Sequence, residues 1–295
     1  MLQSENTSAK RIFFVEDFQI FGERYGIDYR FPQLKDEQVS GSPVLQGNVE
    51  EMTLSSGISL THSDVRVLQP YETTSRHSSP LYMLVVLEGC VMLDIPASVT
   101  AATGMDALTH AIEAYVSVGA HPLTDANALE AIRLINLWLP KAVDDGHNLE
   151  AREQMAFGQY LAGMAFNSAG LGLVHALAHQ PGATHNLPHG VCNAILLPII
   201  ENFNRPNAVA RFARVAQAMG VDTCGMSDEA ASMSAIQAIR DLSARVGIPS
   251  GFSQLGVTKA DIEGWLDKAL ADPCAPCNPR TASRDEVREL YLEAL

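Results

Sequence analysis

The chain has 295 residues, of which 47% are hydrophobic and 18% are charged. This composition is typical of a folded globular protein and excludes a disordered, collagen-like or repetitive chain. Asp and Glu number 34 against 20 Lys and Arg, so the formal net charge is −14. Because no cluster of Lys or Arg occurs, we expect the chain to bind neither nucleic acid nor an anionic membrane surface.

Neither a transmembrane segment nor a signal peptide is expected. The best apolar runs, 81–87 and 194–200, fall far short of the roughly 20 residues that span a bilayer. The N-terminal sequence MLQSENTSAKRIFF is polar where a signal peptide needs an apolar core. Five cysteines, an odd number, fit a reducing compartment better than a disulfide framework. The sequence therefore predicts a cytoplasmic protein.

Alanine usage changes abruptly near Pro96. Residues 1–95 contain one alanine, Ala9, whereas residues 96–295 contain 36. At roughly 100–200 residues per domain, the length allows two domains. We therefore predict two segments of different origin, 1–95 and 96–295, as in a gene fusion.

The first segment shows the short patterns of β-strands. Residues 58–68, 81–87 and 90–93 are predicted strands, separated by turn residues. Earlier in the chain, residues 12–21 fit either a strand or a short amphipathic helix, and residues 40–49 are predicted to form a loop. The segment as a whole is expected to be β-rich.

After Pro96 the hydrophobic spacing becomes helical, and no strand pattern of any length follows. Glycine and proline end several of the helices, with a chain reversal expected at Pro181-Gly182. The first expected helix is capped by Ser98 or Thr103 and runs to about Ser117, and the second is capped by Thr124 and has Leu139 on its apolar face. Further helices are expected at about 150–167, 171–180, 190–200, 207–219, 227–246, 258–271 and 283–293. The predicted fold class is mainly α: an all-α domain preceded by a smaller β-rich segment.

Histidines in the second segment are spaced for metal binding. Asp106 and His110 are four residues apart, which places both side chains on one face of a helix. His175 and His179 share a helix face in the same way, and His189 opens the next helix. A helical hairpin of this kind brings His175 and His189 together.

Imidazole with one carboxylate and no thiolate suits Fe²⁺, Zn²⁺ or Ni²⁺ better than Ca²⁺ or Mg²⁺. Three histidines and one aspartate hold such an ion and still leave room for an exogenous oxygen, so the ion can polarise an alcohol. The alternative is a set of helix-boundary histidines that only form hydrogen bonds. Four histidines within residues 175–189 favour the metal site, with His185 as a reserve ligand.

Two stretches resemble the iron-containing, or group III, alcohol dehydrogenases. The sequence PASVTAATGMDALTHAIEAY at 96–115 is similar to the entry of that family into its helical metal domain. The sequence GLVHALAHQPGA at 172–183, with PHG at 188–190, is similar to its histidine-rich signature. Asn278-Pro-Arg280 is also typical. The resemblance covers 96–295 and implies a helical domain of the dehydroquinate synthase type.

The resemblance also implies roles for individual residues. The implied iron ligands, which would also accept Zn²⁺, are Asp106, His110, His175 and His189. His179 would lie beside the metal as a catalytic residue that relays a proton or positions the substrate, and Phe166 and Cys274 would line the substrate pocket. The implied reaction exchanges a hydride between NAD and a small alcohol or aldehyde. The implied partners are this substrate and further copies of the chain in a homo-oligomer.

The first segment departs from that family. Its members begin with an α/β domain that binds the dinucleotide through a Gly-Gly-Gly-Ser loop, and residues 1–95 contain no Gly-Gly pair. We therefore expect a metal half without a complete dinucleotide-binding α/β domain, and no cofactor-binding residue is assigned. Residues 57–94 instead resemble the sensor of AraC-type regulators, a partial cupin-like barrel. The alternative function is a non-enzymatic effector-binding protein, or a fusion or deletion product without activity.

Overall fold

The computed structural model describes residues 11–25, 27–31, 34, 41–53, 59–68, 72–75 and 95–295. The contacts divide the chain into two compact units, Met1–Tyr82 and Met83–Leu295. Each unit has a hydrophobic core of its own, and the core of the second unit is much the larger.

In the first unit, the described residues form two small antiparallel sheets and one helix. The sheets have the strand orders β1-β3-β4 and β2-β5. Their core contains the buried side chains of Phe13, Phe18 and Val44. The elements are β1 (Arg11–Phe14), α1 (Val15–Tyr25), β2 (Ile27–Arg30), β3 (Pro43–Thr53), β4 (Ser59–Val67) and β5 (Glu72–Ser75).

The strand predictions for this unit have mixed outcomes. Residues 12–21 contain both of the expected alternatives, since strand β1 is followed directly by helix α1. The strand predicted at 58–68 is confirmed as β4. The loop predicted at 40–49 is wrong: β3 is the central strand and pairs with both β1 and β4, so cross-strand pairing overrides weak local propensity. The strands predicted at 81–87 and 90–93 lie outside the described residues.

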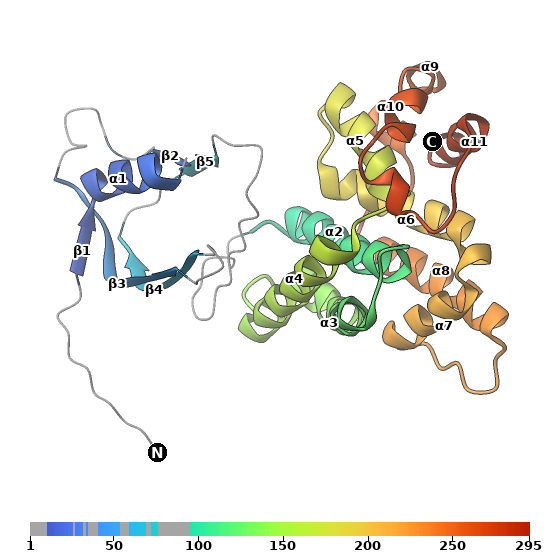
Figure 1. Ribbon diagram of the computed structural model, residues 1–295, viewed down its shortest axis with the longest axis horizontal. Helices are drawn as coiled ribbons and strands as arrows, with labels where there is room; N and C mark the ends of the chain where they lie inside the picture. Colours follow the sequence, from blue (N-terminus) through green and yellow to red (C-terminus); the bar gives the residue numbers. More distant parts are fainter. Residues whose placement is uncertain are drawn as a thin grey trace. The chain divides into compact units, whose positions relative to one another are not determined.

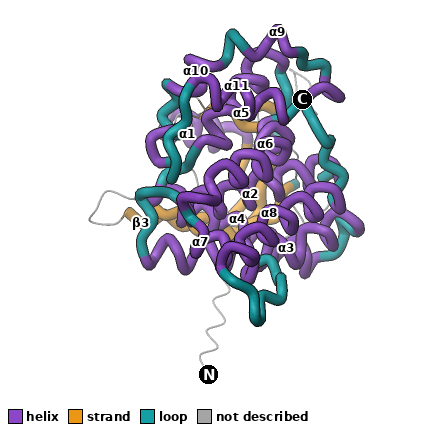
Figure 2. Tube along the Cα trace, turned by 90° about the vertical axis from the view of Figure 1, so that its right-hand side faces the viewer, coloured by secondary structure: helices purple, strands orange, loops and turns teal. Residues whose placement is uncertain are grey.

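Residues 95–295 form helices and no strand, which confirms the mainly α prediction (Figure 1). The α-helices are α2 (Ala97–Val116), α3 (Pro122–Asp144), α4 (Leu149–Ala169), α5 (Leu173–His185), α6 (His189–Asn204), α7 (Val209–Ala218), α8 (Asp228–Arg245), α9 (Lys259–Ile262), α10 (Leu266–Leu270) and α11 (Arg284–Glu293). Short 3₁₀ helices lie at Arg205–Asn207, Phe252–Leu255 and Ala275–Cys277. Figure 2 shows the helices in purple and the loops that join them in teal.

Helix α2 is the centre of the second unit. It contacts α3, α4, α6 and α7, and fourteen of its 20 residues are buried. A helix that is buried on nearly every side needs small and apolar residues all round, which explains its richness in alanine. The polar groups that α2 carries into this core, Asp106, His110 and Glu113, therefore require partners.

Helix α5 differs from its prediction. The chain does not reverse at Pro181-Gly182, because α5 continues to His185 and ends at Asn186 in the left-handed conformation (φ 52°). A proline inside a helix leaves the carbonyl four residues earlier without its donor. Here that carbonyl belongs to Leu177, and it accepts a hydrogen bond from the Tyr291 hydroxyl instead (2.8 Å). A side chain 114 residues further along the chain thus keeps the helix intact.

No single helix among the described residues is both long and apolar enough to cross a membrane. Helices α4 and α5 are long and apolar enough for a membrane span only when they are counted together, and the chain bends by 106° between them.

Candidate metal centre

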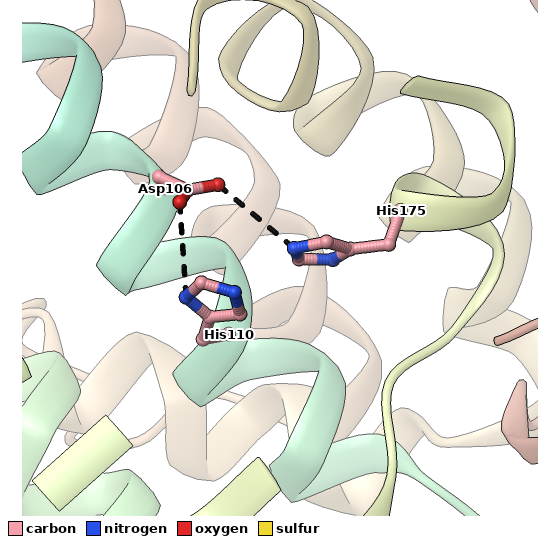
Figure 3. A group of neighbouring side chains, drawn as sticks. All are labelled: Asp106, His110 and His175. Atoms are coloured by element: carbon pink, nitrogen blue, oxygen red, sulfur yellow. Dashed lines mark ion pairs between the residues drawn. The ribbon is translucent and has the colours of Figure 1, made fainter. Parts of the chain in front are cut away.

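The second unit brings the three predicted histidine ligands around the carboxylate of the fourth ligand, Asp106. Asp106 and His110 lie one turn apart on α2, His175 lies in the first turn of α5, and His189 is the first residue of α6. The Asp106 carboxylate lies 4.0 Å from His110 Nδ1, 3.9 Å from His175 Nε2 and 3.5 Å from His189 Nε2. Figure 3 shows the carboxylate facing both His110 and His175. Three helices therefore converge on a single point.

The histidine rings stack against one another and against Phe166. The ring of His110 lies between those of His175 and Phe166, with both centroid distances at 4.6 Å. Burial lowers the pKa of His110 to about 4, so its imidazole is neutral at neutral pH. Its Nδ1 is buried and has no hydrogen-bond partner among the described residues. A buried, neutral nitrogen without a partner is suited to bind a metal ion.

Glu113, also on α2, fixes the orientation of His175. Its Oε2 lies 2.5 Å from His175 Nδ1, and its Oε1 accepts a hydrogen bond from the backbone amide of Val174 (2.7 Å). Burial opposes protonation of His175, but the Glu113 carboxylate outweighs it and raises the pKa of this histidine. A carboxylate that holds Nδ1–H leaves Nε2 facing the centre as a stronger electron-pair donor. Sequence reasoning missed Glu113, although its position three residues after His110 places it on the same helix face.

Asn193 on α6 lies at the point where the ligand atoms converge. Its Nδ2 is 2.5 Å from Asp106 Oδ1, 3.1 Å from His175 Nε2 and 3.0 Å from His189 Nε2. An amide group has two hydrogens and cannot donate to three acceptors at once. Its Oδ1 is buried and has no partner among the described residues. The lone pairs of the Asp106 carboxylate and of the two histidine nitrogens thus converge on one point. One carboxylate oxygen with imidazole nitrogens fits a divalent transition-metal ion.

His179 lies beside the centre rather than in it. Its ring stacks on that of His189, with centroids 5.5 Å apart, and its side chain is 41% exposed. Its Nδ1 lies 2.8 Å from Asp272 Oδ2. Partial burial opposes ionisation of Asp272, but hydrogen bonds from the Cys274 backbone amide and from His179 lower the pKa of this carboxyl. Asp272 follows His179 by 93 residues, so no local pattern could have indicated this pair.

The remaining predicted residues fall in different places. Phe166 and Cys274 are half-buried; Phe166 stacks on His110, and the Cys274 backbone amide donates to Asp272. His185, the reserve ligand, lies elsewhere: its Nε2 is 3.6 Å from Asp261 Oδ2 and its ring packs edge-on against Trp265.

Comparisons with known proteins match the part of the chain that contains these residues. The model of the family described as "Fe-containing alcohol dehydrogenase family, C-terminal" matches residues 100–295. The 1,3-propanediol dehydrogenase of Citrobacter freundii is 50% identical over 204 residues, which cover 69% of this chain and 53% of that protein. The NAD-dependent methanol dehydrogenase of Bacillus methanolicus is 47% identical over 205 residues, which cover 70% and 54%.

A solved structure shares the fold. The crystal structure of a 1,3-propanediol oxidoreductase superposes with a TM-score of 0.69 at 48% sequence identity, over 69% of this chain and 53% of that one. The chain spans about half the length of the curated relatives it matches. The matched half contains every residue of the metal centre described above. This chain therefore belongs to the Fe-containing alcohol dehydrogenase family.

Proposed function

We propose that the second unit binds a divalent transition-metal ion, iron or zinc, and uses it in an alcohol dehydrogenase reaction. The observation that carries the proposal is the convergence of His110, His175 and His189 on the Asp106 carboxylate, within 3.5–4.0 Å. Ligands of one ion at bond lengths near 2 Å are separated by about 3–4 Å, so small movements suffice to bind it. When bound, such an ion polarises an alcohol or carbonyl oxygen.

The protein groups have separate tasks in this reaction. Asp106 supplies the negative charge, and the buried His110 supplies a neutral nitrogen. Glu113 holds His175 by its Nδ1, so that Nε2 faces the ligand cluster. His189 is 44% exposed and lies at the open side of the centre, where a substrate enters.

His179 is the proposed proton relay. An ionised Asp272 only accepts hydrogen bonds, so it fixes the proton of His179 on Nδ1 and leaves Nε2 free to take a proton from the substrate hydroxyl. We place the substrate between His179 and the metal centre, with Phe166 and Cys274 beside it. Burial of these walls limits the access of water.

The proposed substrates are small primary alcohols and aldehydes, with NAD as the hydride partner. Support comes from the names of the relatives, an NAD-dependent methanol dehydrogenase and a 1,3-propanediol dehydrogenase. The side chains of His179 and His189 are 41% and 44% exposed, so the substrate is expected to enter on their side of the centre.

The test combines substrate binding with turnover. The full chain is loaded with Co²⁺, whose visible spectrum reports changes in its ligands, and 1,3-propanediol is added with and without NAD⁺. We expect the diol to shift the spectrum of the Co²⁺-loaded chain, and this shift to be lost in His189→Ala. NADH formation is a second readout, and it also requires a dinucleotide-binding domain. A metal-loaded chain whose spectrum does not respond to the diol would contradict the proposal.

A further inference from the structure

We propose that His179, Asp272 and Cys274 form a second metal site, specific for a soft divalent cation of the zinc and cadmium class. One ligand atom from each of these residues, a nitrogen, an oxygen and a sulfur, lies within 4.8 Å of the other two. The three residues share no member with the ligand set around Asp106, so the second site is distinct in composition and in chemistry.

The geometry suits one ion held by three side chains. His179 Nδ1 and Asp272 Oδ2 are 2.8 Å apart, and the Cys274 sulfur lies within 4.8 Å of the ligand atoms of both residues. A nitrogen and a sulfur thus lie close to one carboxylate, and an ion can replace the hydrogens that they carry. Zinc bonds of about 2.0–2.3 Å place the ligands of a tetrahedral ion roughly 3.3–3.8 Å apart, so the cluster needs to open only slightly.

The supporting contacts hold the site in place. Asp272 Oδ1 accepts a hydrogen bond from the Cys274 backbone amide (2.9 Å), which ties the carboxylate to the loop that carries the thiol. The Asp272 side chain is 10% exposed whereas that of His179 is 41% exposed, so an ion can enter from the His179 side. Three protein ligands leave a fourth, open position for water.

Charge and protons balance in this arrangement. Burial and the neighbouring Asp272 raise the pKa of Cys274 to about 12, so without an ion the residue is a thiol. When the ion binds, the thiol proton passes to solvent, and the imidazole gives up the Nδ1 proton and carries one on Nε2. The dication, the thiolate and the carboxylate then sum to zero, which suits a half-buried site. Sulfur as a ligand selects zinc or cadmium over magnesium or calcium.

One consequence rests on the proposed function. An ion on Nδ1 leaves Nε2 of His179 protonated, so His179 no longer accepts a proton from the substrate. The ring of His179 stacks on that of His189, which places the second ion next to the proposed substrate. Occupancy of the second site therefore inhibits turnover. Binding of the ion itself does not depend on any activity.

The experiment is a titration of the full chain with Cd²⁺, followed through the ultraviolet charge-transfer absorption of a cadmium–thiolate bond. The centre around Asp106 contains no sulfur and is silent in this measurement. We expect a band that saturates with about one Cd²⁺ per chain. It should disappear in Cys274→Ser and persist in Asp106→Asn.

Two other cysteines serve as matched controls. The Sγ of Cys277 faces Gly170 and is not part of the cluster, and Cys224 is exposed. The variants Cys277→Ser and Cys224→Ser should therefore keep the band. Asp272→Asn leaves the sulfur in place and should weaken Cd²⁺ binding by about tenfold or more. This variant tests the second site even if Cys274→Ser fails to fold.

A band that survives in Cys274→Ser, that disappears in Cys277→Ser or Cys224→Ser alone, or that is absent altogether would overturn the second site. The Cd²⁺ titration tests the second site independently of the proposed alcohol dehydrogenase function. A cadmium–thiolate band in a chain that does not respond to alcohols leaves the second site standing, and an alcohol response without the band leaves only the proposed function.

Discussion

Glu113 determines how His175 faces the candidate metal centre. It is 1% exposed, and its two oxygens accept from the His175 ring and from the first turn of α5. Buried carboxylates that hold a histidine ligand orient its ring and raise its basicity. The metal affinity of the centre therefore depends on a residue that does not itself face the ion.

We predict that Glu113→Gln weakens Fe²⁺ binding by about 10–100-fold, because an amide holds Nδ1–H less strongly than a carboxylate does. Competition with a chelator under anaerobic conditions measures this affinity. Glu153→Gln makes the same chemical change at an exposed position on α4, so it is the control and should leave the affinity unchanged. Equal affinities for Glu113→Gln and the unmodified chain would contradict this role.

At this scale, sequence reasoning finds residues that share a helix. The spacing of Asp106 with His110 indicates a shared face, and the structure places both at the centre. Asn193 could have been found in the same way, since it follows His189 by four residues. The pairing of His179 with Asp272 could not, because it joins a helix to a loop that folding alone brings near.

Among the elements, the contact between α2 and α6 sets the distance from Asp106 to His189. Gly190 makes this contact close: a Cβ there would lie 2.3 Å from the backbone oxygen of Ala102 and 3.3 Å from Asp106 Cβ. Backbone atoms cannot move aside as a flexible side chain can, so any larger residue pushes the two helices apart.

Gly190→Ala should therefore lower the free energy of unfolding by about 1–3 kcal/mol and weaken metal binding at the same time. Gly163→Ala on α4 is the matched change, because its Cβ would meet no atom within 4 Å. There alanine should stabilise the helix by about 0.5–1 kcal/mol and leave metal binding unchanged. Denaturant unfolding and chelator competition measure both quantities. The idea fails if the two variants behave alike.

Some helix and strand boundaries could not be predicted from the local sequence alone. Most helices after Pro96 follow from their periodicity, but the single helix predicted at 258–271 is divided into α9 and α10. The continuation of α5 through Pro181 depends on the distant Tyr291 hydroxyl. Strand β3 likewise depends on two partners, β1 and β4, rather than on its own propensity. Local patterns predict elements well where the supporting contacts are also local.

For the molecule as a whole, buried ionisable groups couple stability to pH. Glu201 is fully buried on α6, and burial raises its pKa to about 8 from an ordinary value of 4.5. Its Oε1 has no partner among the described residues, and its Oε2 accepts a hydrogen bond from Asn204 (3.0 Å). The folded state therefore binds this proton more tightly than the unfolded chain does.

The stabilisation from this proton is complete below pH 4.5 and is lost progressively as the pH rises to about 8. At about 1.4 kcal/mol per pKa unit, the loss is on the order of a few kcal/mol. In Glu201→Gln the side chain cannot ionise, so its melting temperature should fall less between pH 5 and 8 than that of the unmodified chain. Parallel melting curves across this range would show that Glu201 does not govern the pH dependence.

Composition alone predicts the division of the chain only in outline. The alanine step at Pro96 and the start of α2 at Ala97 lie close together, because a densely packed helical core needs small residues. The contacts place the division of the two units earlier, after Tyr82. The likeness of residues 57–94 to a regulator sensor stays a prediction.

The central claim is that the second unit holds an ion at Asp106, His110, His175 and His189. The most direct measurement is the Fe²⁺ content of the purified full chain after anaerobic equilibrium dialysis, in a Cys274→Ser background that removes the second site. We predict about one ion per chain, and almost none after the double change His175→Ala with His189→Ala. An unmodified centre that retains almost no iron, or a double variant that retains all of it, would contradict the account.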